Sequence, residues 1–422
     1  MRDLMFARLL TLWDRLRTSL WALPLLMAAI GAALAFAMLR AHLPWAQEVA
    51  WLYGGDAAQA RAFAAALIGA MITLSTLAIS ITMVVLTLAA QQLGPRLIQI
   101  FMSDASTKLS LGLFLGTVVY LLLVLRTIDG NASATPSLAI TLGTTLVLAS
   151  VITLLFFVHS LARSIVSDNV IARVGAALDE AILRAFDEEP RSDEAEPPLE
   201  NAALRLNHCG YVQRIDYHAL ARAGRKHKAR VRLNFRAGAH LIDGEPHAWT
   251  DNARADMQEA LRRAVVIAPQ RDVGQDPEWS AQQLVEVGLR ALSPGINDPF
   301  TAIAVIDRLS IALAHILRRH AHPGVWRDSA DEARVFGPVS CFETMIAAAF
   351  DPLREAAAGK AAVLRQIADN LNALAAIARE DHAPTLQRQL ALLGSVVSRS
   401  IEEAPERDDI LKIVTEARGA CS

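Results

Sequence analysis

The stretch AFAAALIGAMITLSTLAISITMVVLTLAA, from Ala62 to Ala90, decides the fold of this chain. No charged side chain occurs in it, and Arg61 and Gln91 bound it on either side. A helix of roughly 20 apolar residues spans the hydrocarbon core of a bilayer, so this stretch is long enough to cross a membrane with tilt or overhang. It predicts a membrane helix.

Four hydroxyl side chains recur along this predicted helix at steps of three, four and seven residues. They are Thr73, Thr76, Ser80 and Thr87. Residues at this spacing fall on one narrow stripe of a helix. A hydroxyl gains nothing by facing lipid, so the stripe is expected to face another helix or a water-filled path. The four residues are therefore candidates for lining a pore, and helix packing is the alternative.

The composition separates the chain into two halves. Of its 422 residues, 53% are hydrophobic and 20% are charged, yet nearly all long apolar runs precede Ser160. This segregation predicts a membrane half followed by a water-soluble half. The net charge of −2 gives no indication of nucleic acid as a partner. The three cysteines have neither the pairing nor the spacing of a disulfide set or a zinc site.

The membrane half is expected to hold four spans and a short interfacial helix. The interfacial helix covers residues 1–18, the transmembrane region residues 19–163, and the spans about residues 19–39, 62–90, 109–128 and 137–160. Lysine and arginine in the flanks set the orientation. One side has Arg2, Arg8, Arg15, Arg17, Arg96, Lys108, Arg163 and Arg173; the other has Arg40, Arg61 and Arg126. This bias predicts that both termini are cytosolic.

The cytosolic half is expected to be α+β. Residues 164–187 form a helical extension whose apolar seam, which includes Val174 and Leu178, requires a partner helix in this chain or in a second subunit. Residues 188–200 are an acidic, proline-containing linker. Residues 201–250 form a small β-rich subdomain with a hairpin signal at Asp243-Gly244, and residues 251–422 are mainly helical. The whole chain is thus predicted to be mainly α.

A well-marked turn connects two predicted helices of the cytosolic half. In ALSPGINDPFTA, residues 291–302, one helix closes at Ser293, the chain turns through Pro294-Gly295 and Asn297, and the next helix opens with Asp298 as its N-cap. Amides at the start of that second helix are also suited to an anion or to the carboxylate of a neighbouring chain. The sequence leaves open whether this motif is a structural turn or a ligand site.

The ALSPGINDPFTA phrase also carries a resemblance to a known group of proteins. Together with Gly210-Tyr211-Val212-Gln213 and the segment from Arg271 to Asp276, it resembles a bacterial family of predicted integral membrane proteins of unknown function. The resemblance implies a block of transmembrane helices before a cytosolic region, in a bacterial inner membrane. It implies no activity, substrate or catalytic residue.

Few other residues indicate chemistry. The well-marked nucleotide, hydrolase, metalloprotease and redox motifs do not occur in the sequence, so we predict no cofactor, no metal site and no catalytic residue. His315, His320 and His322 lack the helical spacing of metal ligands. Arg271 and Asp276 are predicted to form either an ion pair that closes their loop or part of a ligand site beside the Pro294 turn.

The basic cluster of the cytosolic half has two interpretations. It consists of Arg222, Arg225, Lys226, Lys228, Arg230 and Arg232. A cluster of this kind beneath a membrane can meet anionic lipid headgroups. We expect a solvated loop and strand face instead, because these residues flank a predicted strand.

Two functions remain compatible with the sequence. The first is a homo-oligomeric channel or pore in which the stripe lines a central path and the cytosolic region gates it. The second is a membrane-anchored cytosolic sensor or scaffold without transport activity. The stripe and the helical seam favour the channel, whereas the absence of charged residues within the spans favours the scaffold. The bilayer is a partner in both cases; the ion or ligand is not indicated.

Overall fold

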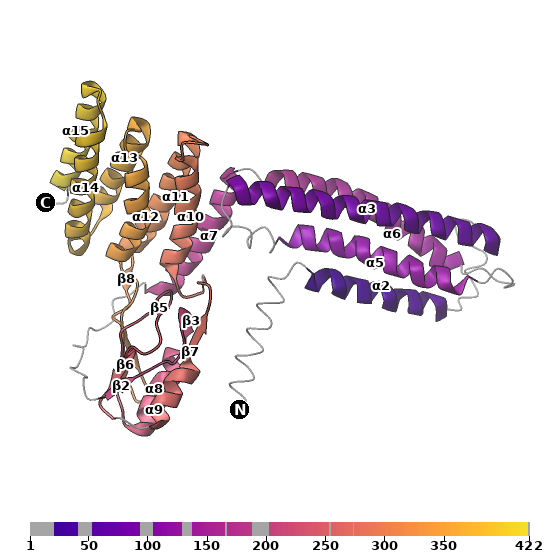
Figure 1. The fold of residues 1–422 in the computed structure, drawn as a ribbon, viewed down its shortest axis with the longest axis horizontal. Coiled ribbons are helices and arrows are strands. Elements are labelled where there is room, and N and C mark those ends of the chain that lie inside the picture. Colours follow the sequence, from indigo (N-terminus) through magenta and orange to yellow (C-terminus); the bar gives the residue numbers. More distant parts are fainter. Residues whose placement is uncertain are drawn as a thin grey trace. The chain divides into compact units, whose positions relative to one another are not determined.

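The computed structural model describes residues 21–40, 53–92, 104–128, 137–164, 167–187, 202–252, 255–272 and 274–420. The chain divides into two compact units, unit 1 (residues 1–169) and unit 2 (residues 170–422). The predicted fold class is confirmed: four apolar helices precede a mixed region of small sheets and C-terminal helices (Figure 1). The predicted interfacial helix 1–18 and the linker 188–200 lie outside the described residues.

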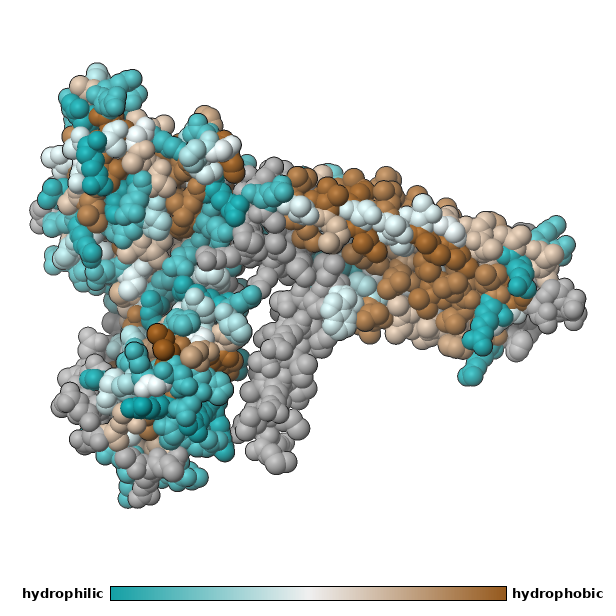
Figure 2. Space-filling view, viewed as in Figure 1, coloured by the Kyte–Doolittle hydropathy of each residue, from teal (hydrophilic) through white to brown (hydrophobic). Residues whose placement is uncertain are grey.

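The described part of unit 1 contains four long helices. They are α2 (Ala22–Arg40), α3 (Ala57–Gln92), α5 (Ala105–Thr127) and α6 (Ser137–Ser164). Each is long and apolar enough to cross a membrane. In Figure 1, α5 lies between α2 and α3, and more than half of its apolar stretch is buried, far more than in the other three. The apolar side chains that cover the outside of this unit (Figure 2) are those expected to face lipid.

Helices α2 and α5 approach each other closely at glycines. A Cβ built on Gly31 would lie 2.3 Å from the carbonyl oxygen of Gly116, and one built on Gly116 would lie 2.8 Å from the carbonyl oxygen of Met27. Gly112 and Gly116 form a GxxxG motif, in which small residues allow two membrane helices to pack backbone to backbone. The α2–α5 contact therefore depends on the absence of side chains.

Helices α5 and α6 are joined by hydrogen bonds between buried polar groups. The Tyr120 hydroxyl donates to the Ala139 carbonyl oxygen at 2.8 Å, and the hydroxyls of Thr117 and Ser150 lie 3.4 Å apart. Such bonds satisfy polar groups that would otherwise be costly in an apolar environment.

Helix α7 (Ser167–Ala185) carries the predicted seam, and its partner lies in the same chain. Ile171, Val174, Leu178 and Ala181 are buried. Asp179 pairs with Arg308 of α11, and the strand β1 (Phe186–Asp187) pairs with β8 (His320–Ala321) just after α11. The first of the two partners that the sequence allowed is therefore the one observed.

The β-rich part of unit 2 contains two further sheets and two helices. The larger sheet has the order β2-β6-β4-β10-β9 and the smaller β5-β3-β7. The strands are β2 (Ala202–Leu204), β3 (Gly210–Ile215), β4 (Val231–Leu233), β5 (His240–Leu241), β6 (Ala248–Thr250), β7 (Val265–Ala268), β9 (Val325–Arg327) and β10 (Ala333–Phe336). The helices are α8 (Tyr217–His227) and α9 (Ala255–Ala264). The hydrophobic core of this β-rich part contains Val231, Leu233 and Phe235, as their alternation in the sequence predicts.

Two sequence-based expectations about this region are wrong. Asp243 and Gly244 form a turn, but not a hairpin, because β5 before the turn pairs with β3 whereas β6 after it pairs with β2 and β4. The basic cluster begins on a helix, α8, rather than in a loop, although five of its six side chains are exposed, as expected for a solvated face. Part of its charge is matched locally: Arg230 pairs with Asp251 at 3.0 Å, and Arg232 lies over the Trp249 ring.

The rest of unit 2 is a stack of helices. They are α10 (Pro277–Ala291), α11 (Pro299–Leu317), α12 (Phe342–Ala356), α13 (Ala361–Ile377), the 3-10 turn η3 (Glu380–His382), α14 (Ala383–Ser400) and α15 (Ala404–Ala420). Helix α11 is the fifth helix among the described residues that is long and apolar enough to cross a membrane. Its Asp307 accepts hydrogen bonds from Gln366 and Asn370 of α13, both at 2.7 Å, and one side of it is buried in unit 2. We therefore interpret α11 as a core helix.

Candidate functional sites

The hydroxyl stripe lies on the exposed surface of α3. Thr73, Thr76, Ser80 and Thr87 are all exposed, whereas the helix buries a different row of residues, which includes Met71, Ala78 and Val85. At 3.6 residues per turn, the stripe is centred roughly 160° around the helix axis from the buried row. The stripe therefore does not pack on the helices of its own unit.

The threonines of the stripe bond to their own helix. Thr73, Thr76 and Thr87 donate to the carbonyl oxygens four residues earlier, at 3.0, 2.9 and 2.8 Å. A threonine in this arrangement satisfies its donor but keeps a lone pair that can accept a hydrogen bond from outside. The stripe thus offers acceptors to whatever lies against this face of α3.

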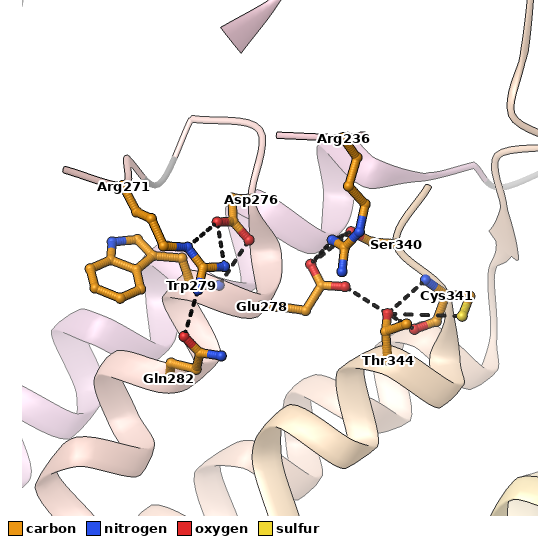
Figure 3. A network of polar contacts seen from close by, with 9 residues as sticks. All are labelled: Arg236, Arg271, Asp276, Glu278, Trp279, Gln282, Ser340, Cys341 and Thr344. Carbon is orange, nitrogen blue, oxygen red and sulfur yellow. Dashed lines mark hydrogen bonds and ion pairs between the residues drawn. The ribbon is translucent and has the colours of Figure 1, made fainter. Parts of the chain in front are cut away.

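Arg271 and Asp276 meet at the start of α10. The Arg271 guanidinium lies 2.6 Å from the Asp276 carboxylate and donates to Gln282 at 2.8 Å, and it covers the Trp279 ring (Figure 3). Asp276 also caps α10 by accepting from the Trp279 amide. Burial raises the pKa of Asp276, against the opposing effect of Arg271. The predicted loop-closing ion pair is present, and a role in ligand binding stays a prediction.

Gly238 allows the loop between β4 and β5 to approach the Asp276 carboxylate. Its φ is +87°, a backbone conformation that disfavours other residues, and a Cβ at this position would collide with the Asp276 carboxylate. Its amide donates to the Val212 carbonyl oxygen at 2.8 Å. The loop from Arg236 to His240 therefore fits directly over the start of α10.

Glu278 forms a second buried network beside the first. Arg236 donates to its carboxylate at 2.6 Å, Ser340 at 2.8 Å and Thr344 at 2.6 Å (Figure 3). Burial opposes the ionisation of Glu278, but the charge of Arg236 and these hydrogen bonds outweigh it and hold the pKa below its ordinary value. Arg236, Ser340 and Thr344 were not among the predicted site residues, because 42 to 66 positions separate them from Glu278 in the sequence.

The SPGINDPF turn is built around Asp298. Its carboxylate accepts from the amides of Phe300 and Thr301, both at 3.1 Å, and from the Thr301 hydroxyl at 2.6 Å. The predicted N-cap is thus confirmed. Hydrogen bonds from the Thr301 hydroxyl and amide hold the pKa of Asp298 below its ordinary value, so an ionised carboxylate already occupies these amides. This geometry favours a structural turn over an anion site.

The rest of the turn is exposed and tightly folded. Helix α10 ends at Ala291, two residues before the predicted Ser293. The Ser293 carbonyl oxygen accepts from the amides of Ile296 and Asn297, and Asn297 adopts a φ of +48°. Ser293 is partly exposed, and Pro294, Gly295 and Asn297 are exposed.

The two predicted ligand regions do not come together. Arg271 and Asp276 precede α10, and the SPGINDPF turn follows it. The helix is continuous over its 15 residues. At 1.5 Å per residue, the helix separates the two regions by roughly 22 Å. The expected constellation of Arg271 and Asp276 beside the Pro294 turn is therefore wrong.

The three histidines that are close in the sequence, His315, His320 and His322, contact different residues. His315 lies 3.6 Å from Asp179, His320 lies near Arg379, and His322 stacks on Trp326. In the described ranges, no three histidine, cysteine, aspartate or glutamate side chains are placed to hold a metal ion.

Comparison with known proteins extends over both units. Residues 17–373 match the model of a family described as predicted membrane protein (DUF2254). Uncharacterized proteins of Mycobacterium bovis and Mycobacterium tuberculosis are each 26% identical to this chain over 419 residues, which cover 94% of this chain and 80% of the relative. No solved structure matches the chain. These similarities confirm the resemblance found in the sequence.

Proposed function

This chain belongs to the DUF2254 family of predicted membrane proteins, and on that premise we propose that it forms a homo-oligomeric channel lined by α3. One observation carries the proposal: the hydroxyl stripe of α3 faces away from the helices of its own unit. In a single chain within a bilayer the stripe would face lipid. Around a central axis of several copies, the same stripe would face water.

The chemistry of the stripe suits a narrow aqueous path. Hydroxyl and carbonyl oxygens can replace part of the hydration shell of an ion without a fixed charge, and an apolar ring can gate the path by dewetting. Met83 occupies the one turn of the stripe that lacks a hydroxyl and is 58% exposed. We place such an apolar constriction at Met83.

Unit 2 would then act as a cytosolic gating domain. Only residues 165 and 166 separate α6 from α7, and α7 is clamped to α11 through Asp179 and Arg308. A conformational change in unit 2 that moves α7 would therefore be transmitted to the end of the membrane helix α6 through a two-residue connection. The arginine bias of the flanks supports a cytosolic position for unit 2 and for both termini.

Cysteine accessibility tests the pore. Cysteines would replace Thr73, Thr76, Ser80 and Thr87 in turn in a chain without Cys209, Cys341 and Cys421, and the reconstituted protein would be treated with a small polar thiol reagent. Leu77 and Ile79 are matched controls, because they are 51% and 54% exposed but lie to either side of the stripe. We expect reaction at the four stripe positions and none at the two controls.

Ion flux into liposomes is the second readout. Ser80→Leu should lower flux, because a bulkier apolar side chain favours dewetting, whereas Ile79→Leu should leave it unchanged. The mass of the solubilised particle gives the subunit number. Stripe cysteines that all stay unreactive in a folded particle, together with no flux, would remove the channel and favour the alternative, a membrane-anchored cytosolic sensor or scaffold.

A further inference from the structure

The turn between α10 and α11 presents two large apolar side chains to the surroundings. Ile296 is 47% exposed, and Phe300, at 80%, is the most exposed large apolar side chain in the described part of the chain. Pro294 and Gly295 beside them are exposed too. Single exposed apolar residues are common on proteins, but two large ones within five positions of one turn indicate a contact surface.

The turn holds these side chains in a fixed position. The Asp298 amide donates to the Ala291 carbonyl oxygen at 2.7 Å, which closes the loop, and Lys360 donates to the Leu292 carbonyl oxygen. From Ser293 to Ile306 the chain contains a single charged residue, Asp298, and its carboxylate is turned onto the start of α11. We call Ile296 and Phe300 the apolar tip.

The apolar tip lies at the end of unit 2 where α7 begins. Helices α7 and α11 run in the same direction, because Gly175 faces Arg308 and, further along, Phe186 pairs with Ala321. Both helices rise 1.5 Å per residue. Ser167 lies eight residues before Gly175, and Phe300 lies eight residues before Arg308, so Ser167 and Phe300 are at the same level along the two helices. Phe300 is therefore level with the first residue of α7.

The chain enters unit 2 from a membrane helix at this same end. Helix α6, which is long and apolar enough to span a bilayer, ends at Ser164, three residues before α7 begins. The apolar tip is thus carried by the end of unit 2 that is covalently tethered to the membrane. A lipid surface is consequently present at high effective concentration for this tip.

We propose that the apolar tip inserts into the lipid bilayer at the surface from which α6 emerges. Apolar and aromatic side chains on an uncharged turn partition into the boundary between headgroups and acyl chains, and they need no anionic lipid to do so. Insertion would hold the α11 end of unit 2 against the bilayer. The inference is independent of whether α3 lines a pore.

Quenching by labelled lipids tests the insertion. The full-length chain without its native cysteines would carry Ile296→Cys labelled with an environment-sensitive fluorophore, in phosphatidylcholine vesicles with or without nitroxide-labelled acyl chains. Ile377→Cys is the matched control. Ile377 is 44% exposed and is the last residue of α13. The nearby Arg379 donates to the carbonyl oxygen of Arg319, which follows the C-terminus of α11, so Ile377 lies at the other end of unit 2. We expect roughly twofold or greater quenching at position 296 and none at position 377.

A second variant shows what drives the contact. Phe300→Ser, added to the labelled Ile296→Cys chain, should reduce the quenching while the melting temperature stays unchanged, because Phe300 is exposed. High salt should not reduce the quenching, since no charge is involved. Quenching that is absent or equal at both positions overturns the proposal. So does a disulfide that an added oxidant forms between two unlabelled Ile296→Cys chains at low protein density, when the labelled chain shows no lipid quenching, because this result would assign the tip to a second copy.

Discussion

The Arg236 guanidinium lies 2.6 Å from the Glu278 carboxylate and joins the loop after β4 to the first turn of α10. The side chain of Glu278 is 4% exposed and that of Arg236 27%. Ser340 and Thr344, before and within α12, donate to the same carboxylate. Three segments distant in the sequence therefore depend on one buried charge.

Removal of this charge should destabilise unit 2. Glu278→Ala leaves the partly buried Arg236 without its partner and two hydroxyls without their acceptor, and the loss of one member of a buried ion pair costs about 3–5 kcal/mol. Chemical denaturation of the full chain in detergent measures the change. The cost should approach the lower limit, because Arg236 still reaches water.

The control is an exposed ion pair in the same unit. Glu343 pairs with Arg388 at 3.0 Å, and both side chains are more than half exposed. Glu343→Ala should change the unfolding free energy by about 0–1 kcal/mol. Equal effects of the two substitutions would contradict the structural role assigned to Glu278.

Asp298 should make stability depend on pH in the acid range. Its folded pKa lies below the ordinary value, so the unfolded state binds protons first as the pH falls. Its contribution is present above a pH of about 4, and it is lost as the pH falls through the folded pKa. Asp298→Asn keeps a capping oxygen and should melt close to the parent at neutral pH, with a smaller loss of stability in acid.

Asp298→Ala distinguishes capping from ligand binding. Loss of the cap should cost about 0.5–2 kcal/mol at neutral pH, and any activity should fall in step with stability. If the variant melts like the parent and yet loses ion flux, the SPGINDPF turn has a role beyond structure.

The orientation of the membrane helices can be tested with fusions. We expect no signal from a reporter that is active only in the periplasm when it is attached after Ser422, because the arginine bias predicts a cytosolic C-terminus. The same reporter placed in the connection between α2 and α3 should be active. The reverse pattern would relocate unit 2 to the other side of the membrane.

The sequence predicts the membrane helices well because one physical requirement determines them. A long apolar run must be helical in a bilayer, and the predicted span 62–90 lies within α3. The helix begins earlier, at Ala57, because Asp56 accepts from the Gln59 amide and stabilises its first turn. A charged residue such as Arg61 ends an apolar run but does not end a helix.

The polar networks of unit 2 depend on contacts that no local pattern encodes. Asp298 could be identified from its neighbours, since a cap bonds within three residues. Arg236 and Glu278 are 42 positions apart, and their pairing exists only once β4 and α10 have been placed. The strand β10 pairs in parallel with β4, about a hundred residues earlier, and this pairing likewise has no local signal.

Gly31 should be intolerant of even one added carbon. A Cβ there would lie 2.3 Å from the Gly116 carbonyl oxygen, and a backbone atom of a packed helix cannot move away as a flexible side chain can. Gly31→Ala should therefore separate α2 from α5 and destabilise unit 1 by about 1–3 kcal/mol. Ala33→Val is the matched control, because Ala33 is exposed on the same helix, and it should change stability by less than about 0.5 kcal/mol. Thermal melting of the solubilised protein compares the two variants. If the Gly31→Ala and Ala33→Val proteins have the same melting temperature, α2 does not pack on α5 at Gly31.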